Sequence, residues 1–462
     1  MPTNPRSLLV LALGLALQTT RGADGTGSDL FARNWPGWRG PLASGVGPSA
    51  TPPLTWAEDQ NVKWKVPVPG RGTASPVVWE DQIFLLTAIP AAEPAAAPTQ
   101  PAPPAESGGR PRGRPAGPGG AMTESPTTPQ KFTVLALDRS SGKIRWQQTP
   151  RTQVPHEGHH RDHGFASGSP VTDGEVLIAS FGSYGVYAYD LKGRLLWEKN
   201  LGQMHTRNSF GEGSSPALDG DFVVVLWDHE GDDFIVALDK RTGQERWRQR
   251  RDEPTGWCTP LIVTHAGRKQ VIVNGTNRAR GYDLTTGTPL WECAGQTANA
   301  IPSAVADSER VYLMSGFRGA TCHAITLGRS GDLTGTDAIA WSLNKGTPYV
   351  PSPLLSQGRL YFYAGNNPQL SIHDAKTGKV ELETTRLNGI SGVYASPVAA
   401  AGRVYLVGRE GTTVVIKDGP GLEILATNKL SENFDASPAL AGREMFLRGQ
   451  EMLYCLALSA PK

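Results

Sequence analysis

One eleven-residue stretch occurs in two similar copies in this chain, as ALDRSSGKIRW at 136–146 and ALDKRTGQERW at 237–247. Looser copies recur along the sequence. They are AYDLKGRLLW at 188–197, GYDLTTGTPLW at 281–291, IHDAKTGKVEL at 372–382 and a degenerate IKDGPGLEIL at 416–425. A unit that recurs in one chain indicates a repeat architecture, in which each copy buries its apolar face against its neighbours.

A second signature, usually Ser-Pro followed by small apolar residues, accompanies these copies. It starts at Ser75, Ser169, Ser215, Thr259, Ser303, Ser352, Ser396 and Ser437. Successive starts are 94, 46, 44, 44, 49, 44 and 41 residues apart. Apart from the first, these spacings are those of a four-stranded propeller blade.

Each unit also divides into four short strands. In 396–425 the apolar segments SPVAA, VYLVG, TTVVIK and LEIL are separated by the turns AGR, REG and DGPG. In the D-x-x-T-G turn, the Asp side chain bonds to nearby backbone and Gly supplies a positive φ. Aromatic rings on the fourth strand are expected to wedge between neighbouring sheets. These rings are Trp146, Trp197, Trp247, Trp291 and Trp341.

The last unit ends after three strands. The segment NVKWKV at 61–66 resembles the fourth strand of the other units, so we expect it to complete the last sheet and remove the open edges. The sequence therefore predicts an all-β fold: an eight-bladed β-propeller of four-stranded antiparallel blades over 61–458, closed by strand 61–66.

Three segments fall outside the repeats. Residues 1–23 combine Arg6 with the apolar run 8–17 and predict a signal peptide, with an uncleaved anchor as the alternative. Residues 24–60 form an extension in which WPGWRGP is expected to pack against the propeller wall. Residues 90–130, rich in Pro, Ala and Gly, predict a disordered insert between strands two and three of the first blade. We thus expect a periplasmic or extracellular protein, without stable membrane insertion after signal cleavage.

Charge and cysteine content narrow the function classes. The formal net charge is +2 over 462 residues, which argues against nucleic acid as a partner. Export permits disulfides, but the pairing among Cys258, Cys293, Cys322 and Cys455 stays open. No nucleophile with an evident base occurs, so no catalytic residue is assigned.

Unusual loops gather on one face of the predicted ring, where the blade-to-blade connections and the turns between strands two and three lie. Repeat folds tend to carry function in such loops. Aromatic rings with charged groups between them suit a small polar or anionic ligand, whereas the alternative is a plugged channel with solvated arginines. The candidate ligand-binding residues are His163, Phe165, Arg207, Phe210, Glu212, Trp257, Arg278, Arg318, Tyr349, Tyr394, Arg409, Phe434, Asp435 and Arg448.

Two loops contain potential metal ligands. The run 156–165 holds four histidines, Glu157 and Asp162, which suit Zn²⁺ or Cu²⁺, although their spacing matches no known motif. The acidic DHEGDD at 228–233 lacks the spacing of an EF-hand loop. A hydrogen-bonded polar loop is the simpler interpretation of the run 156–165. We therefore assign no metal-binding residues.

The motifs WPGWRGP (35–41), ASGSPVTDGE (166–175), FGEGSSP (210–216) and TPYVPSPLL (347–355) resemble those of secreted PQQ-like β-propeller repeat proteins. That family shares the fold of quinoprotein alcohol dehydrogenases and of the outer-membrane-assembly propeller lipoprotein, and the resemblance covers residues 35–458.

The resemblance implies two functions. One is an exported binding or scaffold protein that engages a small polar or anionic ligand, or a protein partner, at the loop-rich mouth. The other is a PQQ-dependent oxidoreductase. Such dehydrogenases hold calcium with a Glu, Asn and Asp set and cover the quinone with adjacent cysteines. This chain has no adjacent cysteines and no recognisable calcium set. We therefore expect a binding protein without a cofactor. The alternatives are the PQQ-dependent oxidoreductase and a metal-dependent enzyme that uses the histidine loop.

Overall fold

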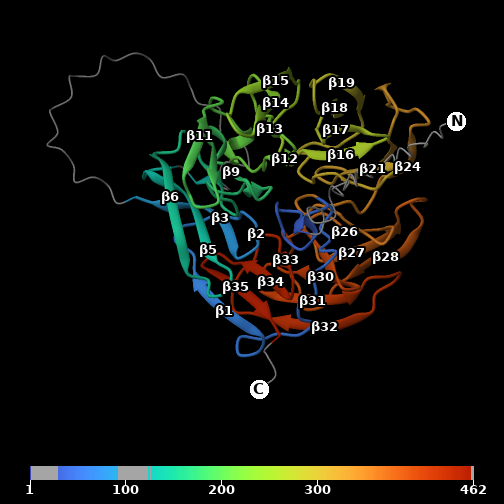
Figure 1. The fold of residues 1–462 in the computed structure, drawn as a ribbon. Helices are drawn as coiled ribbons and strands as arrows, with labels where there is room; N and C mark the ends of the chain where they lie inside the picture. The colour runs from blue at the N-terminus through green and yellow to red at the C-terminus, as the bar shows by residue number, and fades with distance from the viewer. Residues whose placement is uncertain (2–29, 92–122, 125, 459–462) are drawn as a thin grey trace, which may run out of the picture.

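Eight sheets are arranged in a ring around a central channel (Figure 1). The computed structural model describes residues 1, 30–91, 123–124 and 126–458. Each of these eight sheets contains four antiparallel strands, and a short parallel strand extends one of them. A separate two-stranded sheet lies outside the eight blades. The predicted all-β, eight-bladed propeller is confirmed.

The blades follow one another in chain order. Blade 1 contains β2 (Val77–Trp79), β3 (Gln82–Pro90), β5 (Gln130–Asp138) and β6 (Ile144–Gln153). Blade 2 contains β8 (Val171–Thr172), β9 (Val176–Ser180), β10 (Val186–Asp190) and β11 (Leu195–Lys199). Blade 3 contains β12 (Ala217–Asp219), β13 (Phe222–Trp227), β14 (Phe234–Asp239) and β15 (Glu245–Arg250). Blade 4 contains β16 (Leu261–His265), β17 (Arg268–Val273), β18 (Ala279–Asp283) and β19 (Pro289–Cys293), extended by β23 (Gly331–Asp332).

The second half repeats the pattern. Blade 5 contains β20 (Val305–Ala306), β21 (Arg310–Ser315), β22 (Thr321–Thr326) and β24 (Ile339–Leu343). Blade 6 contains β25 (Leu354–Ser356), β26 (Arg359–Tyr363), β27 (Gln369–Asp374) and β28 (Val380–Arg386). Blade 7 contains β29 (Val398–Ala400), β30 (Arg403–Val407), β31 (Thr412–Lys417) and β32 (Ile424–Lys429). Blade 8 contains β33 (Ala439–Ala441), β34 (Glu444–Arg448), β35 (Met452–Ala457) and, as its outer strand, β1 (Val62–Pro67).

The ring closes where the two ends of the propeller meet. Strand β1 pairs antiparallel with β35, from Val62 opposite Leu456 to Pro67 opposite Met452. In Figure 1 the blue N-terminal strand accordingly lies beside the red C-terminal blade. The closing role predicted for 61–66 is confirmed.

The repeated eleven residues join each blade to the one before it. In blade 3, Asp239 accepts the amide N–H groups of Arg241 and Thr242 and closes the turn, while Gly243 has a φ of 68°. The ring of Trp197 from blade 2 lies against this glycine, where an added Cβ would be 2.7 Å from the indole. Its N–H donates to the Lys240 carbonyl at 2.8 Å.

The same contact recurs around the ring. The indole N–H donates across the blade boundary to a carbonyl in the next turn, over 2.8–3.1 Å, from Trp64, Trp146, Trp197, Trp247 and Trp341. Trp291 differs, because its N–H donates to Gln270 within its own blade. The near-identity of the copies thus reflects one docking geometry repeated between blades.

The Ser-Pro signature builds a closed hydrogen-bonded ring around the channel. The amide N–H of its first residue donates to the hydroxyl of the equivalent residue in the next blade. The eight bonds measure 2.8–3.2 Å, and the last runs from Ser437 N–H to the Ser75 hydroxyl at 3.0 Å. These bonds hold the eight inner strands at one level along the channel. We call the eight residues that form them the hydroxyl ring: Ser75, Ser169, Ser215, Thr259, Ser303, Ser352, Ser396 and Ser437.

The extension before β1 crosses the channel on the far side of the hydroxyl ring from the loop-rich face. Trp35 is fully buried and bridges Val78 in blade 1, while Val46 bridges Ala399 in blade 7. The Pro36 carbonyl accepts the Thr172 N–H of blade 2. The expected packing on the wall holds for Trp35, but Trp38 faces the channel instead. We call residues 35–47 the plug.

Other expectations concern the termini, the insert and the cysteines. The signal peptide falls almost entirely outside the described residues, as does most of the insert, so export and disorder stay predictions. The range 90–130 does connect β3 to β5, and its β4 (Thr123–Glu124) pairs with β7 (His159–His160). All four cysteines are buried free thiols. Within the described residues, no helix is long and apolar enough to cross a membrane.

Candidate functional site: the central funnel

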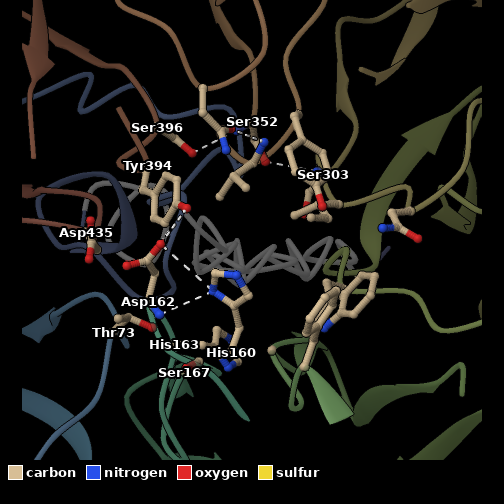
Figure 2. A pocket seen from close by; sticks show the side chains of 18 of the residues that line it. Thr73, His160, Asp162, His163, Ser167, Ser303, Ser352, Tyr394, Ser396 and Asp435 are labelled. Carbon is tan, nitrogen blue, oxygen red and sulfur yellow. Dashed lines mark hydrogen bonds and ion pairs between the residues drawn. The ribbon is translucent and has the colours of Figure 1, made fainter. Parts of the chain in front are cut away.

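A cavity of about 960 Å³, which we call the funnel, lies at the centre of the ring, and Figure 2 shows side chains that line it. Its walls come from the blade-to-blade connections, including the 3-10 turn η3 (Arg207–Ser209), and from the turns after β21 and β26. All eight residues of the hydroxyl ring line its lower part, and Trp38 of the plug contributes to its lining as well. The lining therefore combines the loop-rich face, the hydroxyl ring and the plug.

One wall combines aromatic rings with unpaired guanidinium groups. Phe317 and Tyr349 are stacked with centroids 4.8 Å apart, and the Arg318 guanidinium lies 5.3 Å from the Phe317 ring. Trp257 is oriented by its indole N–H, which donates to the Gly211 carbonyl at 2.7 Å. Among the described residues, no carboxylate pairs with Arg318 or with Arg207, which lines the same cavity.

The other wall carries both carboxylates of the funnel lining, and one arginine bonds to the two of them. Arg409 donates to Asp435 through two bonds of 2.6 and 3.1 Å and lies 3.3 Å from Asp162. Its guanidinium stacks 4.0 Å from the Tyr394 ring, and the Tyr394 hydroxyl donates to Asp162 at 3.2 Å. Burial works to raise the pKa of Asp162, but the Arg409 charge outweighs it and holds this pKa below its usual value.

The two funnel histidines are neutral at physiological pH. His160 Nδ1 accepts the Asp162 backbone N–H at 3.2 Å, so the proton of the neutral ring is on Nε2. Burial lowers the pKa of His160. Burial also lowers the pKa of His163, to about 3, and its Nδ1 has no hydrogen-bond partner. Neither imidazole adds positive charge to the cavity.

Two further cations are buried next to the funnel. Arg39, behind Trp38, donates to the carbonyls of Pro397, Ser44 and Pro353 over 2.7–3.1 Å. Arg448 donates to the carbonyls of Leu86 and Ala74, beside the hydroxyl ring. Burial lowers the pKa of each to about 9, so both stay protonated at neutral pH. Backbone carbonyls accept from both guanidinium groups, although Arg39 Nε has no hydrogen-bond partner. In the described residues no carboxylate pairs with either group.

Most of the predicted mouth residues do line the funnel. They are His163, Arg207, Phe210, Trp257, Arg318, Tyr349, Tyr394 and Asp435. Arg409 lies directly behind two of them.

Five predicted residues lie elsewhere. Phe434 is fully buried in the core of blades 7 and 8, edge-on to Tyr454. Arg448 points inward between blades 8 and 1 and is 2 % exposed. Phe165 and Glu212 line a separate small pocket beneath the first two connections. A one-dimensional pattern places these residues near the mouth, but the direction of each side chain is set by packing between blades.

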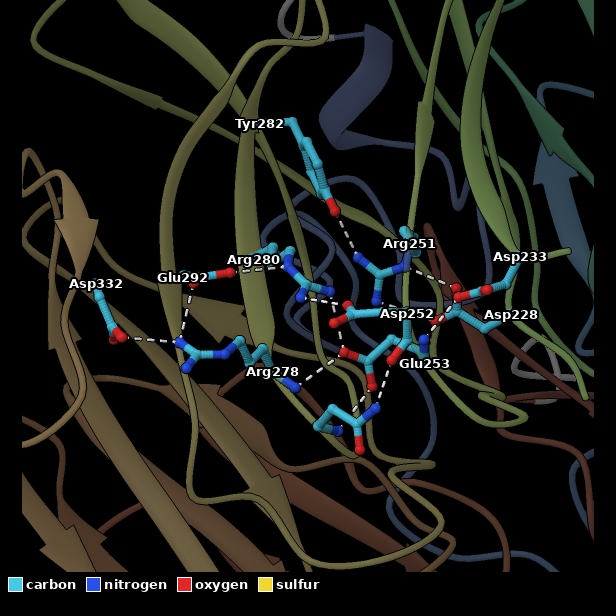
Figure 3. A network of polar contacts seen from close by, with 11 residues as sticks. Asp228, Asp233, Arg251, Asp252, Glu253, Arg278, Arg280, Tyr282, Glu292 and Asp332 are labelled. Carbon is cyan, nitrogen blue, oxygen red and sulfur yellow. Dashed lines mark hydrogen bonds and ion pairs between the residues drawn. The ribbon is translucent and has the colours of Figure 1, made fainter.

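Arg278 belongs to a charged network on the flank of blade 4 (Figure 3). It pairs with Glu292 and Asp332 at 3.0 Å each. The network continues inward to Arg251, which forms a fully buried pair with Asp228. The turn before β18 folds toward the outer strand, so Arg278 lies outside the funnel.

Several lining residues were not predicted. The hydroxyl ring had a clear signal in the Ser-Pro signature, which was interpreted only as the start of the inner strands. Trp38, His160 and Asp162 occur in segments that were singled out as motifs, and Phe317 precedes the candidate Arg318. Nothing in the sequence indicates which of these side chains face the cavity. Asn299, with a φ of 56°, has no sequence signal at all.

The residues present do not fit a calcium-bound quinone. Asp162 and Asp435 are the carboxylates of the lining, and both bond to Arg409. A calcium ion would have to displace this guanidinium before either carboxylate could join its shell. The four cysteines lie singly in the core, so no pair covers the cavity. The acidic residues of 228–233 also have partners, since Asp228 pairs with Arg251 and Asp233 accepts the Glu253 N–H.

Known structures share this architecture at low sequence identity. The quinohemoprotein alcohol dehydrogenase of Comamonas testosteroni aligns with a TM-score of 0.61 and 11% identity, covering 95% of this chain and 83% of its own. The corresponding enzyme ADHIIG of Pseudomonas putida HK5 gives 0.58 and 12%, covering 95% and 84%. BamB of Moraxella catarrhalis gives 0.49 and 13%, covering 71% and 90%. These likenesses concern the fold.

No curated protein matches the sequence. A family model does match, in three overlapping stretches at 54–212, 130–325 and 184–393. Its description is outer membrane protein assembly factor BamB. The matched stretches cover most of the propeller, and the chain therefore belongs to this family of PQQ-like β-propeller repeat proteins.

Proposed function

We propose that this protein is a binding protein whose central funnel takes a small organic anion. One observation carries the proposal, namely the excess of guanidinium groups in and around the cavity. Arg207 and Arg318 face the funnel without carboxylate partners, and Arg39 and Arg448 are buried beside it with carbonyl partners only. Burying an uncompensated charge is costly, so a ligand that supplies the missing negative charge gains affinity.

The shape of the cavity narrows the ligand class. A cavity of about 960 Å³ accommodates a molecule the size of a cofactor or a short oligosaccharide. The stacked pair Phe317 and Tyr349, together with Trp257, favours a planar ring system. Guanidinium groups bind carboxylates through paired hydrogen bonds. An aromatic or quinoid polycarboxylate combines these properties.

Pyrroloquinoline quinone, a planar tricarboxylate, is therefore a suitable probe. We expect it to bind without supporting turnover, because the carboxylates that calcium needs are paired with Arg409. The fold shared with two quinohemoprotein alcohol dehydrogenases motivates the probe, and their activity is not proposed for this chain. The family description and the predicted signal peptide support a location in the cell envelope.

The test is calorimetric titration of the quinone into the untagged protein. The Arg207→Ala and Arg318→Ala variants are each expected to weaken binding about tenfold or more, since a lost charge-assisted bond is worth roughly 1.5–3 kcal/mol. Arg329→Ala is the matched control, because Arg329 is an exposed arginine paired with Asp337 on the outside of blade 5. Binding should also weaken with salt.

Citrate, a non-planar tricarboxylate, separates charge from shape and should bind more weakly than the quinone. If the two arginine variants bind the quinone as tightly as the parent protein does, the proposed anion site in the funnel is wrong. Turnover of alcohols that requires both the quinone and Ca²⁺ would instead establish the oxidoreductase, and a stable protein complex that blocks the funnel would favour a scaffold.

A further inference from the structure

Three potential metal ligands converge at the rim of the funnel, outside the cavity itself. His156 and Glu157 lie in the connection after β6, and His205 lies in the connection after β11. One ligand atom from each lies within 4.8 Å of the other two. These two connections also carry Asp162 and Arg207 into the funnel. A shared ligand here would tie the two loops together.

The His156 ring is oriented as metal-binding imidazoles usually are. Its Nε2 lies 2.6 Å from the Met204 carbonyl, and because a carbonyl only accepts, Nε2 carries the proton. The lone pair is therefore on Nδ1, which accepts the Tyr184 hydroxyl at 3.1 Å. A carbonyl on the far nitrogen fixes the tautomer and raises the basicity of the near one.

The other two side chains are held in place by hydrogen bonds around them. Glu157 Oε1 accepts the Thr206 hydroxyl and N–H, and Oε2 shares this N–H at 3.2 Å. Oε2 lies 4.0 Å from His205 Nδ1, and a carboxylate oxygen has a second lone pair for a further partner. The backbone of His205 is held on both sides, because its N–H donates to His229 and its carbonyl accepts the Glu230 N–H. Its imidazole is 69% exposed and can rotate toward the carboxylate.

We propose that His156 Nδ1, Glu157 Oε2 and His205 Nδ1 form a site for a divalent cation of the Zn²⁺ type, with water as the fourth ligand. Two imidazoles and one carboxylate are a common zinc donor set, with bonds of about 2.0–2.2 Å. Tetrahedral geometry requires these atoms to approach to roughly 3.5 Å of one another. Rotation of the exposed His205 ring would bring its nitrogen toward Glu157, and His156 would exchange the Tyr184 hydroxyl for the metal.

The test is a competition titration of Zn²⁺ between the untagged protein and a chromophoric chelator. The parent protein should bind one equivalent. His205→Ala and Glu157→Gln should each weaken this binding more than about tenfold. His205 is the sharper site for substitution, because its ring is exposed and its removal leaves the packing of the loop intact. His265→Ala, on β16 of blade 4, is the matched control and should bind Zn²⁺ as the parent does.

A further variant examines the donor set. Tyr184→Phe frees His156 Nδ1 from its present partner, so Zn²⁺ affinity should stay equal or increase. A marked loss in this variant would mean that the phenol oxygen is a ligand, which contradicts the proposed set. Absence of saturable Zn²⁺ binding, or binding that His205→Ala leaves unchanged, would overturn the site. The funnel ligand plays no part in this measurement.

Discussion

Glu212 should make the stability of this propeller depend on pH near neutrality. Its carboxylate accepts the Ser183 hydroxyl at 2.5 Å and the Ser183 N–H at 2.8 Å, with no cation beside it. Burial raises its pKa from 4.5 to about 7, against the opposing effect of the Ser183 bonds. An acid with a raised folded-state pKa contributes stability that is fully present below pH 4.5 and is lost as the pH rises through 7.

The size of the effect follows from the two pKa values. A rise from 4.5 to about 7 corresponds to roughly 3 kcal/mol, at about 1.36 kcal/mol for each tenfold change in proton affinity. Roughly 2–3 kcal/mol of this falls between pH 5 and pH 8. Glu212→Gln keeps the size of the side chain and the acceptor for Ser183, but it does not ionise. The stability of the variant relative to the parent should therefore increase by that amount from pH 5 to pH 8.

Urea unfolding of both proteins at the two pH values measures this difference. Buried histidines such as His163, whose pKa is lowered to about 3, act with the opposite sign at acidic pH, but they are common to both proteins and cancel. Asp232→Asn is the control, since its side chain is 97% exposed, and its difference from the parent should stay constant. The reasoning is refuted if the Glu212→Gln difference is the same at pH 5 and pH 8.

Three further predictions concern the framework. Asp228→Asn should cost about 3–5 kcal/mol in urea unfolding, because it leaves Arg251 buried without its carboxylate, and adding Arg251→Met should recover much of the loss; no recovery would contradict a charge effect. Removing residues 1–67 should abolish cooperative thermal unfolding, whereas removing only 1–50 takes away the plug but leaves β1 in place, so equal melting curves would contradict closure by β1. Removing 92–121 should change the melting temperature by less than about 2 °C, because loop length contributes little to stability, and a larger loss would mean that the insert packs on the propeller.

The fold was predictable because the local structure of each repeat is determined by residues close together in the sequence. The D-x-x-T-G turns are set by the side chain and backbone of consecutive residues, as the bonds of Asp239 show. The closing strand was predictable by counting, since the last unit lacked one strand and 61–66 resembled it. The tryptophans were expected between blades, and their hydrogen bond to the next turn is the specific form that this packing takes.

The plug and the hydroxyl ring were not predictable in the same way. The plug touches blades 1, 2 and 7, which are far apart in the sequence, and it contains no repeat that indicates where it binds. The hydroxyl ring depends on the rotation of each blade relative to the next. Only that rotation brings the Ser75 hydroxyl beside the Ser437 N–H, 362 residues along the chain.

The sequence by itself determined the number of blades, the order of the strands and the strand that closes the ring. Local hydrogen bonds and apolar periodicity encode these properties, and both are readable from neighbouring residues. Only the tertiary structure decided which side chains meet in the funnel. Tyr394 and Phe434 both precede an inner strand, yet one faces the cavity and the other is core. The surroundings of each ring come from residues distant in the chain, and those contacts set its direction.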